Sequence, residues 1–378
     1  MKVKSFQKNT HLIILAFLLS FIIMSLGHVV VFALAVYIFH LDLWAIHGLK
    51  WFLMAMPANI VLSSFLIHKK DHLLIRWYYI FSMVWIGWFF NFLLFITPLA
   101  ALKLVWRFQN HFFDASHYAW LLLILSTLFT ILNIAYAFYP KIRRLAVKIK
   151  DLPDYWENKT LVLISDVHIG PVYRQRFLNR AIDRINQLNP SVVLIGGDLF
   201  DGMEADFFWL HEPFKRLSAP QGVYYAIGNH DLYLGLKNVF EIFRESDIRV
   251  LNNERIVRKG LQFIGINYFK QDSLSLEKII LSRVGYDAKM PSVLLWHEPK
   301  RIAQAKAAGI DLMLAGHTHN GQMWPLNFIA KWVYKGYNYG LYQDHDFSLY
   351  VSCGLGTWGP PLRNTSRSEI VAIRLEKK

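Results

Sequence analysis

Four long apolar stretches in the first 140 residues set the strongest limit on what this chain can fold into. They lie at about residues 12–39, 49–67, 77–104 and 118–139. Each holds roughly the 20 apolar residues that an α-helix needs to cross a bilayer. No stretch of similar length and hydrophobicity follows Pro140. The sequence therefore predicts a transmembrane region of about four helices, residues 1–140, followed by a domain outside the bilayer.

The net charge of +14 resides mainly in the membrane half. Residues 1–150 carry 14 Lys and Arg against three Asp, a net of +11, whereas the remaining residues carry 27 basic against 24 acidic side chains, a net of +3. This small excess gives no strong basic footprint, so no nucleic-acid partner is expected. Basic residues gather before the first stretch, between the second and third, and after the fourth. The positive-inside rule then predicts an integral protein of the plasma (inner) membrane, with both termini and the C-terminal domain in the cytoplasm.

A signal peptide is the alternative interpretation of residues 1–36, where three lysines precede an apolar run with small residues at Ala33 and Ala35. The run is about twice as long as an ordinary signal-peptide core, which favours an uncleaved anchor. Cys353 is the only cysteine, so the chain forms no intrachain disulfide. This agrees with a reducing compartment.

Residues 141–159 are expected to be a basic juxtamembrane segment and linker. Residues 141–150, KIRRLAVKIK, alternate basic and apolar side chains directly after the fourth stretch. Such a segment fixes topology, and a helix lying on anionic headgroups is the alternative. Residues 151–159 are expected to be a short linker, because Pro, Asp and Asn interrupt the pattern.

From residue 160 onward, short apolar runs alternate with helical stretches. Runs of this length fit strands buried in a layered α/β domain. Residues 173–188 are predicted to form an amphipathic helix. The predicted strands are residues 160–165, 191–197, 222–228, 261–266, 292–296, 311–316 and 347–352.

Side chains that can bind metals follow five of these runs. Loops at the carboxyl ends of strands in α/β sheets converge on one crevice, where ligands bind. Carboxylate, imidazole and amide oxygen together suit divalent metals such as Zn, Mn or Fe. The residues are Asp166, His168, Asp198, Asp201, Asn229, His230, Asp231, His297, His317 and His319.

In this order the motifs SDVHIG, GGDLFDG, GNHD, WHEP and GHTHNGQ resemble the signature of the calcineurin-like metallophosphoesterases. The resemblance covers about residues 160–375. The sequence VSCGLGTWGPPLRNTSRSEI is similar to the membrane-anchored bacterial branch of the family. The resemblance implies that residues 160–378 form a four-layer α/β/β/α domain with a two-metal site at the sheet edge, following the helical membrane region.

The resemblance also implies a ligand set for two divalent metal ions, with Mn, Zn or Fe expected and Mg as an alternative. Two metals about 3.5–4 Å apart lower the pKa of a bridging water, so that a hydroxide attacks phosphorus in line without a protein nucleophile. One metal would be bound by Asp166, His168 and His319, the second by Asn229, His297 and His317, with Asp198 bridging both.

Three further residues receive expectations beside this ligand set. His230 is expected to contact the phosphate or protonate the leaving oxygen, with Asp231 orienting its ring. Asp201 is expected to support a ligand or the site loop, with a solvated turn as the alternative. Asn320 stands where many relatives have glycine, which leaves the local shape of that loop open.

The leading functional hypothesis is a membrane-anchored hydrolase of a phosphoester or pyrophosphate. A lipid or lipid-linked substrate best explains a tether, and by resemblance the pyrophosphate of UDP-diacylglucosamine is one named example. Residues 323–339 are aromatic and basic. The favoured interpretation is a structured insertion that packs its aromatic side chains on the domain, and the alternative is a loop that docks on the bilayer or takes an acyl chain. A phosphodiesterase or nuclease acting on a soluble substrate, a protein phosphatase, and a non-enzymatic metal-binding membrane sensor all stay open. The sequence predicts no oligomeric state.

Overall fold

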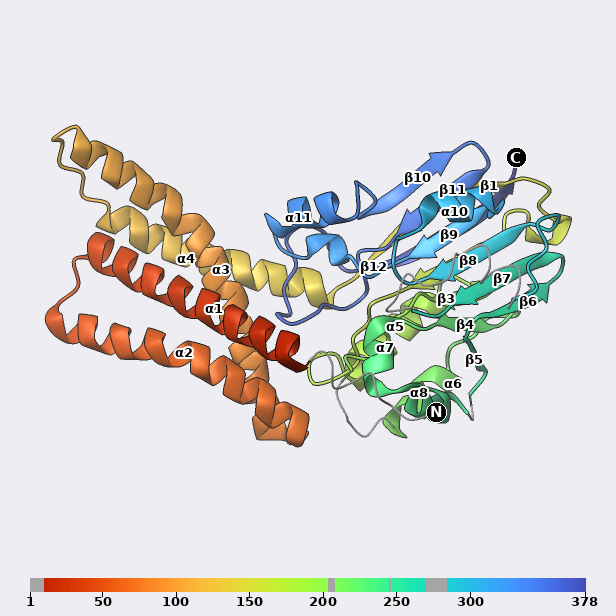
Figure 1. Ribbon diagram of the computed structural model, residues 1–378, viewed down its shortest axis with the longest axis horizontal. Helices are drawn as coiled ribbons and strands as arrows, with labels where there is room; N and C mark the ends of the chain where they lie inside the picture. Colours follow the sequence, from red (N-terminus) through yellow and green to blue (C-terminus); the bar gives the residue numbers. More distant parts are fainter. Residues whose placement is uncertain (1–9, 203–207, 245, 269–283) are drawn as a thin grey trace. The chain divides into compact units, whose positions relative to one another are not determined.

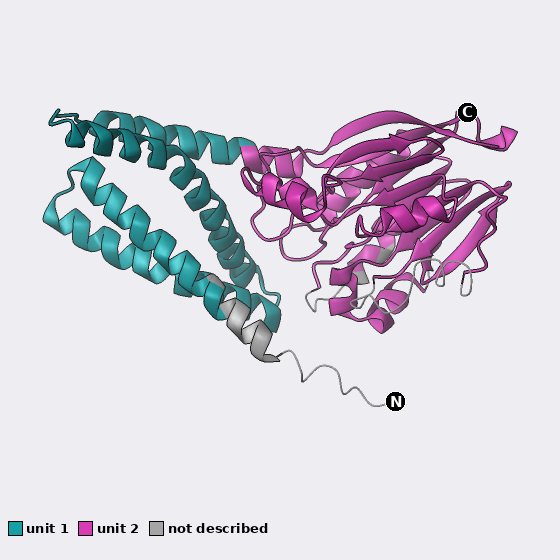
Figure 2. Ribbon diagram, turned by 45° about the horizontal axis from the view of Figure 1, so that its top comes forward, with its two compact units in different colours: residues 1–132 teal, residues 133–378 magenta. Residues whose placement is uncertain are grey.

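The computed structural model describes residues 10–202, 208–244, 246–268 and 284–378. The chain divides into two compact units, Met1–Leu132 and Asn133–Lys378 (Figure 2). The division falls inside the fourth helix, so the last turns of that helix belong to the second unit.

The first unit consists of long apolar helices (Figure 1). Among the described residues, four helices are long and apolar enough to cross a membrane, as the four stretches predict. Polar side chains inside them bond to one another: Asn91 Nδ2 donates to Thr130 Oγ1 at 2.9 Å, and Trp88 Nε1 donates to Thr127 Oγ1 at 2.9 Å. Such pairs satisfy groups that lipid cannot. The helices are α1 (Thr10–Phe39), α2 (Leu43–Lys69), α3 (Leu73–Phe108) and α4 (Ser116–Phe138).

The second unit contains two six-stranded sheets packed face to face. The first has the order β1-β12-β2-β3-β4-β5 and the second β10-β11-β9-β8-β7-β6. The first sheet consists of β1 (Lys141–Ile149), β12 (Glu369–Lys377), β2 (Thr160–Ile164), β3 (Val192–Ile195), β4 (Val223–Ala226) and β5 (Ile248–Leu251). The second consists of β10 (Gly340–Asp344), β11 (Phe347–Val351), β9 (Leu312–Ala315), β8 (Ser292–Trp296), β7 (Leu261–Ile266) and β6 (Glu254–Arg258).

Alternation along the strands builds the layers. In β2, Leu161 and Leu163 face the core between the sheets, whereas Val162 and Ile164 face helices on the outer side. Helices α5 (Gln175–Asn186), α6 (His211–Lys215) and α8 (Leu236–Phe243) cover the first sheet, and α10 (Ile302–Ala307) covers the second. Because side chains point alternately to the two faces, a strand buried on both sides is apolar throughout. The predicted four-layer α/β/β/α domain is confirmed.

The expected limits of the segment between the two regions need correction. Residues 141–149 are strand β1, which pairs in parallel with β12 along its whole length, so they belong to the domain's first sheet. The alternative of a membrane-surface helix is wrong for the same reason. Val147 and Ile149 are fully buried in the core between the sheets, whereas Arg144 and Lys148, on the opposite face of the strand, are exposed. Edge strands often carry charged side chains. In β1 these charges gave the sequence the basic pattern expected of a juxtamembrane segment.

Candidate metal centre

Five strands bring the predicted ligands to one place. Strands β2, β3 and β4 are parallel neighbours in the first sheet, and β8 and β9 are parallel neighbours in the second. Each predicted ligand lies just after one of these strands, and all are buried except the half-buried His317. They are Asp166, His168, Asp198, Asn229, His297, His317 and His319.

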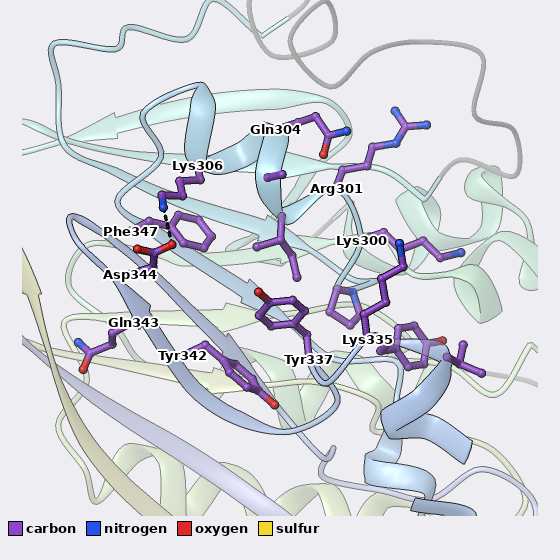
Figure 3. Close-up of a pocket in the computed structure, with 15 residues that line it drawn as sticks. Lys300, Arg301, Gln304, Lys306, Lys335, Tyr337, Tyr342, Gln343, Asp344 and Phe347 are labelled. Carbon is purple, nitrogen blue, oxygen red and sulfur yellow. Dashed lines mark hydrogen bonds and ion pairs between the residues drawn. The ribbon is translucent and has the colours of Figure 1, made fainter. Parts of the chain in front are cut away.

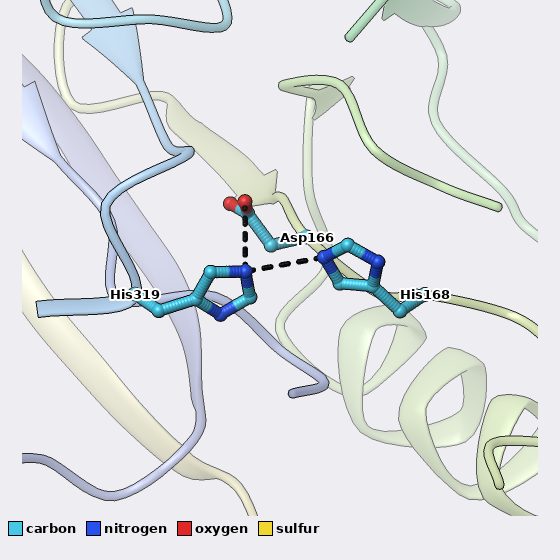
Figure 4. Close-up of side chains that lie close together, drawn as sticks. All are labelled: Asp166, His168 and His319. Atoms are coloured by element: carbon cyan, nitrogen blue, oxygen red, sulfur yellow. Dashed lines mark hydrogen bonds and ion pairs between the residues drawn. The ribbon is translucent and has the colours of Figure 1, made fainter. Parts of the chain in front are cut away.

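The first group combines Asp166, His168 and His319 (Figure 4). His168 Nε2 lies 3.1 Å from His319 Nε2, which lies 3.5 Å from Asp166 Oδ1. One ligand atom from each of the three residues lies within 4.8 Å of the others. One carboxylate oxygen and two imidazole nitrogens at this spacing fit a single divalent ion. The group has the same members as the first ligand set implied by the resemblance.

The second group combines Asp198, His297 and His317 at the same 4.8 Å limit. His297 Nε2 lies 2.9 Å from Asp198 Oδ2 and 3.3 Å from His317 Nδ1. His297 Nε2 is also 4.0 Å from Asp166 Oδ1, so the two groups are immediate neighbours. Asn229 is buried at the start of α7 (Asn229–Leu234), the helix that follows β4.

Hydrogen bonds with backbone groups fix the orientation of several candidate ligands. Asp166 Oδ1 accepts from the backbone N–H of His317 at 2.9 Å, and Asp198 Oδ1 accepts from the backbone N–H of His230 at 2.8 Å. His297 Nδ1 lies 2.8 Å from the carbonyl oxygen of Gly196. A ring N–H that donates to a carbonyl leaves the other ring nitrogen available to a metal. The Nε2 atom of His297 is therefore presented to the centre of the site.

The backbone around the ligands is held in an uncommon conformation. Asp166, His168, Asp198, His317 and His319 all have φ between 48° and 69°, the left-handed region. Such conformations cost free energy in non-glycine residues and persist where the surrounding structure enforces them, often at functional sites. Two glycines also permit close approach at the centre: a Cβ on Gly316 would lie 2.2 Å from Asp166 Oδ2, and one on Gly228 would lie 2.2 Å from Asp198 Oδ1.

Two buried oxygens show that a cation fits this cluster. Asp166 Oδ2 and Asn229 Oδ1 are buried and have no hydrogen-bond partner among the described residues. Leaving a buried polar atom unpaired costs free energy, so a native structure normally supplies it with a partner. A divalent ion would satisfy both oxygens, and the imidazole, carboxylate and amide donors match Zn, Mn or Fe.

The pKa shifts of the site have two opposing causes. Burial lowers the pKa of His317 to about 3, and the neighbouring His297 adds to this effect, so the ring of His317 is neutral. Burial also opposes a charge on His297, but the carboxylates of Asp198 and Asp166 outweigh it and raise the pKa of His297 to about 10. The buried carboxylates are thus stabilised by a positive charge close by, which a bound metal ion would also supply.

The surroundings of His230 differ from the expectation. His230 Nδ1 lies 3.0 Å from the backbone carbonyl oxygen of Asp201, which therefore orients the ring. The Asp201 carboxylate lies 3.4 Å from His168 Nδ1, as expected of a residue that supports a ligand. The Asp231 carboxylate instead accepts backbone N–H groups from Asp198 at 2.9 Å, Phe200 at 3.1 Å and Gly228 at 2.7 Å. The expectation that Asp231 orients His230 needs correction, because its oxygens are bonded to the backbone of the ligand loops.

This arrangement predicts that Asp231→Ala destabilises the domain. Three buried N–H groups would lose their acceptor, at about 1–3 kcal/mol each. A loss of about 3 kcal/mol corresponds to a decrease of roughly 6–12 °C in the Tm of a domain of this size. Thermal unfolding of the detergent-solubilised chain measures it, with Asp231→Asn as the control that keeps one acceptor oxygen. An unchanged Tm together with lost turnover would instead support a direct catalytic role.

The structure shows the local shape of the loop at Asn320, which the sequence left open. It has φ 52° and ψ 36°, a left-handed conformation that asparagine tolerates better than most residues with a side chain. Its Oδ1 accepts from Asn338 Nδ2 at 2.7 Å. The asparagine therefore takes the backbone conformation that a glycine would allow and adds a tie to the segment after α11 (Leu326–Val333).

Sequence reasoning missed Arg363 in the C-terminal tail segment, residues 352–368. Its side chain is fully buried, with Nη2 3.1 Å from His319 Nδ1 and Nη1 donating to the His319 carbonyl oxygen at 3.3 Å. The same segment lies on the first ligand loop, since the N–H of Gly356 donates to the Asp166 carbonyl oxygen at 2.8 Å. Arg363 thus lies behind a predicted ligand. Its only sequence signal is its place in the glycine- and proline-rich stretch.

A groove of about 1000 Å³ lies beside the second group (Figure 3). Tyr334 lines it, and the ring of Tyr334 is 6.1 Å from the ring of His317. Glu298, which was not predicted as a site residue, lies 3.7 Å from His317 Nε2 and pairs with Lys300 at the groove. The groove presents mostly basic and aromatic side chains, among them Lys300, Arg301, Lys306, Lys335, Tyr337 and Tyr342.

Several known proteins with similar sequences are named metallophosphoesterases or proteins with a metallophosphoesterase domain. A Helicobacter pylori (strain J99) protein named as an uncharacterized metallophosphoesterase is 34% identical over 242 residues, which cover 61% of this chain and 64% of that protein. A Danio rerio transmembrane protein with metallophosphoesterase domain is 32% identical, over 63% of this chain and 58% of its own. An uncharacterized metallophosphoesterase of Aquifex aeolicus is 27% identical, over 64% of this chain and 94% of its own.

The chain spans less than two thirds of the length of the Helicobacter and Danio relatives. The family model described as calcineurin-like phosphoesterase matches residues 159–321, which run from β2 to the loop after β9 and contain every predicted ligand. The chain therefore carries a calcineurin-like metallophosphoesterase domain.

Proposed function

We propose that the protein is a membrane-anchored, metal-dependent hydrolase of a phosphoester or pyrophosphate. The observation that carries this proposal is the pair of neighbouring ligand groups, one of Asp166, His168 and His319 and the other of Asp198, His297 and His317. The groups meet where His297 Nε2 lies 2.9 Å from Asp198 Oδ2 and 4.0 Å from Asp166 Oδ1. Asp198 is the residue we assign to both metals, and Asn229 we assign to the second.

Bound divalent ions would polarise phosphoryl oxygens and lower the pKa of a bound water. The protein's own groups supply the rest. Asp166 and Asp198 balance the charge of the cations, and the backbone contacts described above fix their orientation. His230 lies beside the first group, with its ring centroid 4.8 Å from that of His168. Since its Nδ1 faces a carbonyl oxygen, its Nε2 is the atom we assign to the phosphate or the leaving oxygen.

We propose a lipid or lipid-linked phosphate as the substrate. The basic and aromatic groove beside His317 has room for the part of the substrate that is not cleaved. Lys306 and Lys300 pair with Asp344 and Glu298, so Lys335 is the groove residue that we assign to a further phosphate or another anionic group. The four apolar helices hold the enzyme at the membrane, and the distribution of basic residues favours the inner membrane with the domain in the cytoplasm.

Metal removal and replacement test the proposal. The full chain should be used, because β1 and the end of α4 belong to the domain's compact unit. We expect chelation to abolish turnover and Mn, Zn, Fe or Mg to restore it, measured with bis-p-nitrophenyl phosphate, p-nitrophenyl phosphate and a lipid pyrophosphate. Preference for the lipid supports the substrate assignment, whereas preference for a diester supports a soluble-substrate phosphodiesterase or nuclease. Metal binding without any turnover would identify a sensor.

A further inference from the structure

Helix α11 exposes nearly all of its apolar side chains. Trp332 is 81% exposed, Phe328 60% and Ile329 58%, and only Ala330 is buried. Trp332 lies four residues after Phe328 and three after Ile329, so the three side chains lie on one face of the helix. Trp324, just before the helix, is 49% exposed. Within residues 323–339, Tyr334 and Tyr339 are half-buried and pack on the domain, against His317 and Glu369. The interpretation of a structured insertion that packs its aromatic side chains therefore holds for these tyrosines and not for Trp324, Phe328 and Trp332. A continuous apolar surface of this kind marks a contact with another body.

The tail segment ties this surface to the end of the last long apolar helix. The backbone N–H of Trp324 donates to Asn364 Oδ1. The neighbouring Arg363 donates its backbone N–H to the carbonyl oxygen of Asn133 at 3.0 Å. Ser368 then caps the final turn of α4, donating its N–H to the Tyr136 carbonyl oxygen at 3.1 Å and its hydroxyl to that of Ala137 at 2.9 Å. Carbonyls in the last turn of a helix lack partners within the helix, so these bonds fix the tail on the helix end.

The location and composition of the surface select its partner. If α4 crosses a membrane, its last turn lies at the boundary between the hydrocarbon and the headgroups. The exposed face of α11 is linked to that turn by the tail segment. Tryptophan favours this interface. Residues 323–339 contain Lys331 and Lys335 and no acidic residue, which suits anionic headgroups.

We propose that the exposed face of α11, formed by Trp324, Phe328, Ile329 and Trp332, docks on the bilayer that holds the apolar helices. The proposal rests on the membrane anchoring given above and not on catalysis. It has a consequence for the site, because α11 begins five residues after Gly321 of the 3₁₀ turn (His319–Gly321) and ends beside Tyr334, which contacts His317. Docking of α11 would place this side of the metal cluster at the headgroups.

A spin label at Ile329 tests the proposal in the full chain. Ile329→Cys can be labelled selectively, because Cys353 is fully buried. The chain would be reconstituted in nanodiscs of phosphatidylcholine and phosphatidylglycerol. Oxygen, which concentrates in lipid, and a nickel chelate, which stays in water, then report where the label lies. Val257→Cys is the matched control, since Val257 is an exposed apolar residue on β6 of the same domain.

We expect a higher ratio of oxygen to nickel accessibility at position 329 than at position 257. A label at Trp332→Cys should give the same high ratio as the label at position 329. An equal ratio at 329 and 257 would overturn the proposal, since it would place α11 in water. Protection of position 329 from both reagents would also overturn it, since protein would then cover the helix. Dipolar coupling between labels would identify that cover as a second copy. All of these readouts are independent of turnover, so an inactive preparation leaves the result interpretable.

Discussion

Replacing Asp198 with alanine is expected to lower kcat/KM by at least about 10³-fold. Asp198 is buried, lies 2.9 Å from His297 and belongs to the group that we assign to the second metal. Metal ions contribute several kcal/mol to stabilising a phosphoryl transition state, and each 1.36 kcal/mol corresponds to a factor of ten in rate. Losing the residue assigned to both metals should remove most of that contribution.

Turnover and metal content should be measured together in this variant. We expect Asp198→Ala to retain fewer metal ions per chain than the parent protein after dialysis. Asp198→Asn keeps the side-chain volume, and so separates the loss of charge from the creation of a cavity. Asp183→Ala is the matched control, because Asp183 is exposed on α5 and pairs only with Arg216 among the described residues. Metal-dependent turnover at the parental rate in Asp198→Ala would refute the two-metal assignment.

The strands that the sequence predicted are those with neighbours on both sides. Residues 160–165, 191–197 and 222–228 correspond to β2, β3 and β4, each placed between two other strands. A strand buried on both faces must be apolar throughout, and a run of that kind is visible in a single sequence. The four strands at the sheet edges, β1, β5, β6 and β10, were missed. Edge strands are short or charged, so their sequences do not differ clearly from loops.

The last strand, β12, shows a second reason for a miss. It lies between β1 and β2 in space although it is the last strand in the chain. Its pairing with β1 also brought residues 141–149 into the sheet. Pairings between the two ends of a domain leave no local signal, because each strand is specified by a partner more than 200 residues away.

The candidate metal centre also has a part that the sequence predicts and a part that it does not. The positions of the candidate ligands were predictable because each follows a buried strand, and the parallel strands of each sheet bring their ends together. The surroundings of the ligands were not. Asp231 follows His230 in the chain, yet its carboxylate faces the backbone of Asp198 and Phe200. Arg363 lies 44 residues from His319 and contacts its ring. Contacts of this kind depend on how loops cross in space, and neither spacing nor composition records them.

Replacing His230 with alanine is expected to lower kcat by about 10²–10³-fold for a substrate with a poor leaving group, within the range found for general acids. The metal ligands should be unaffected, because the contact between His230 and Asp198 comes from the backbone N–H, which alanine retains. The effect should be much smaller for p-nitrophenyl esters. Their leaving group is a weak base that departs without a proton, whereas an alkoxide needs one.

Comparing an alkyl phosphate with the corresponding p-nitrophenyl phosphate therefore isolates the role of the ring. Tyr233→Phe is the control, since Tyr233 is exposed and its ring lies 5.2 Å from that of His230 without contributing to the ligand groups. Metal content of His230→Ala should equal that of the parent chain. An equal loss of kcat on both esters would assign His230 to binding the phosphate and not to protonating the leaving oxygen. Loss of metal would show that the ring itself supports the ligands, which would contradict both roles.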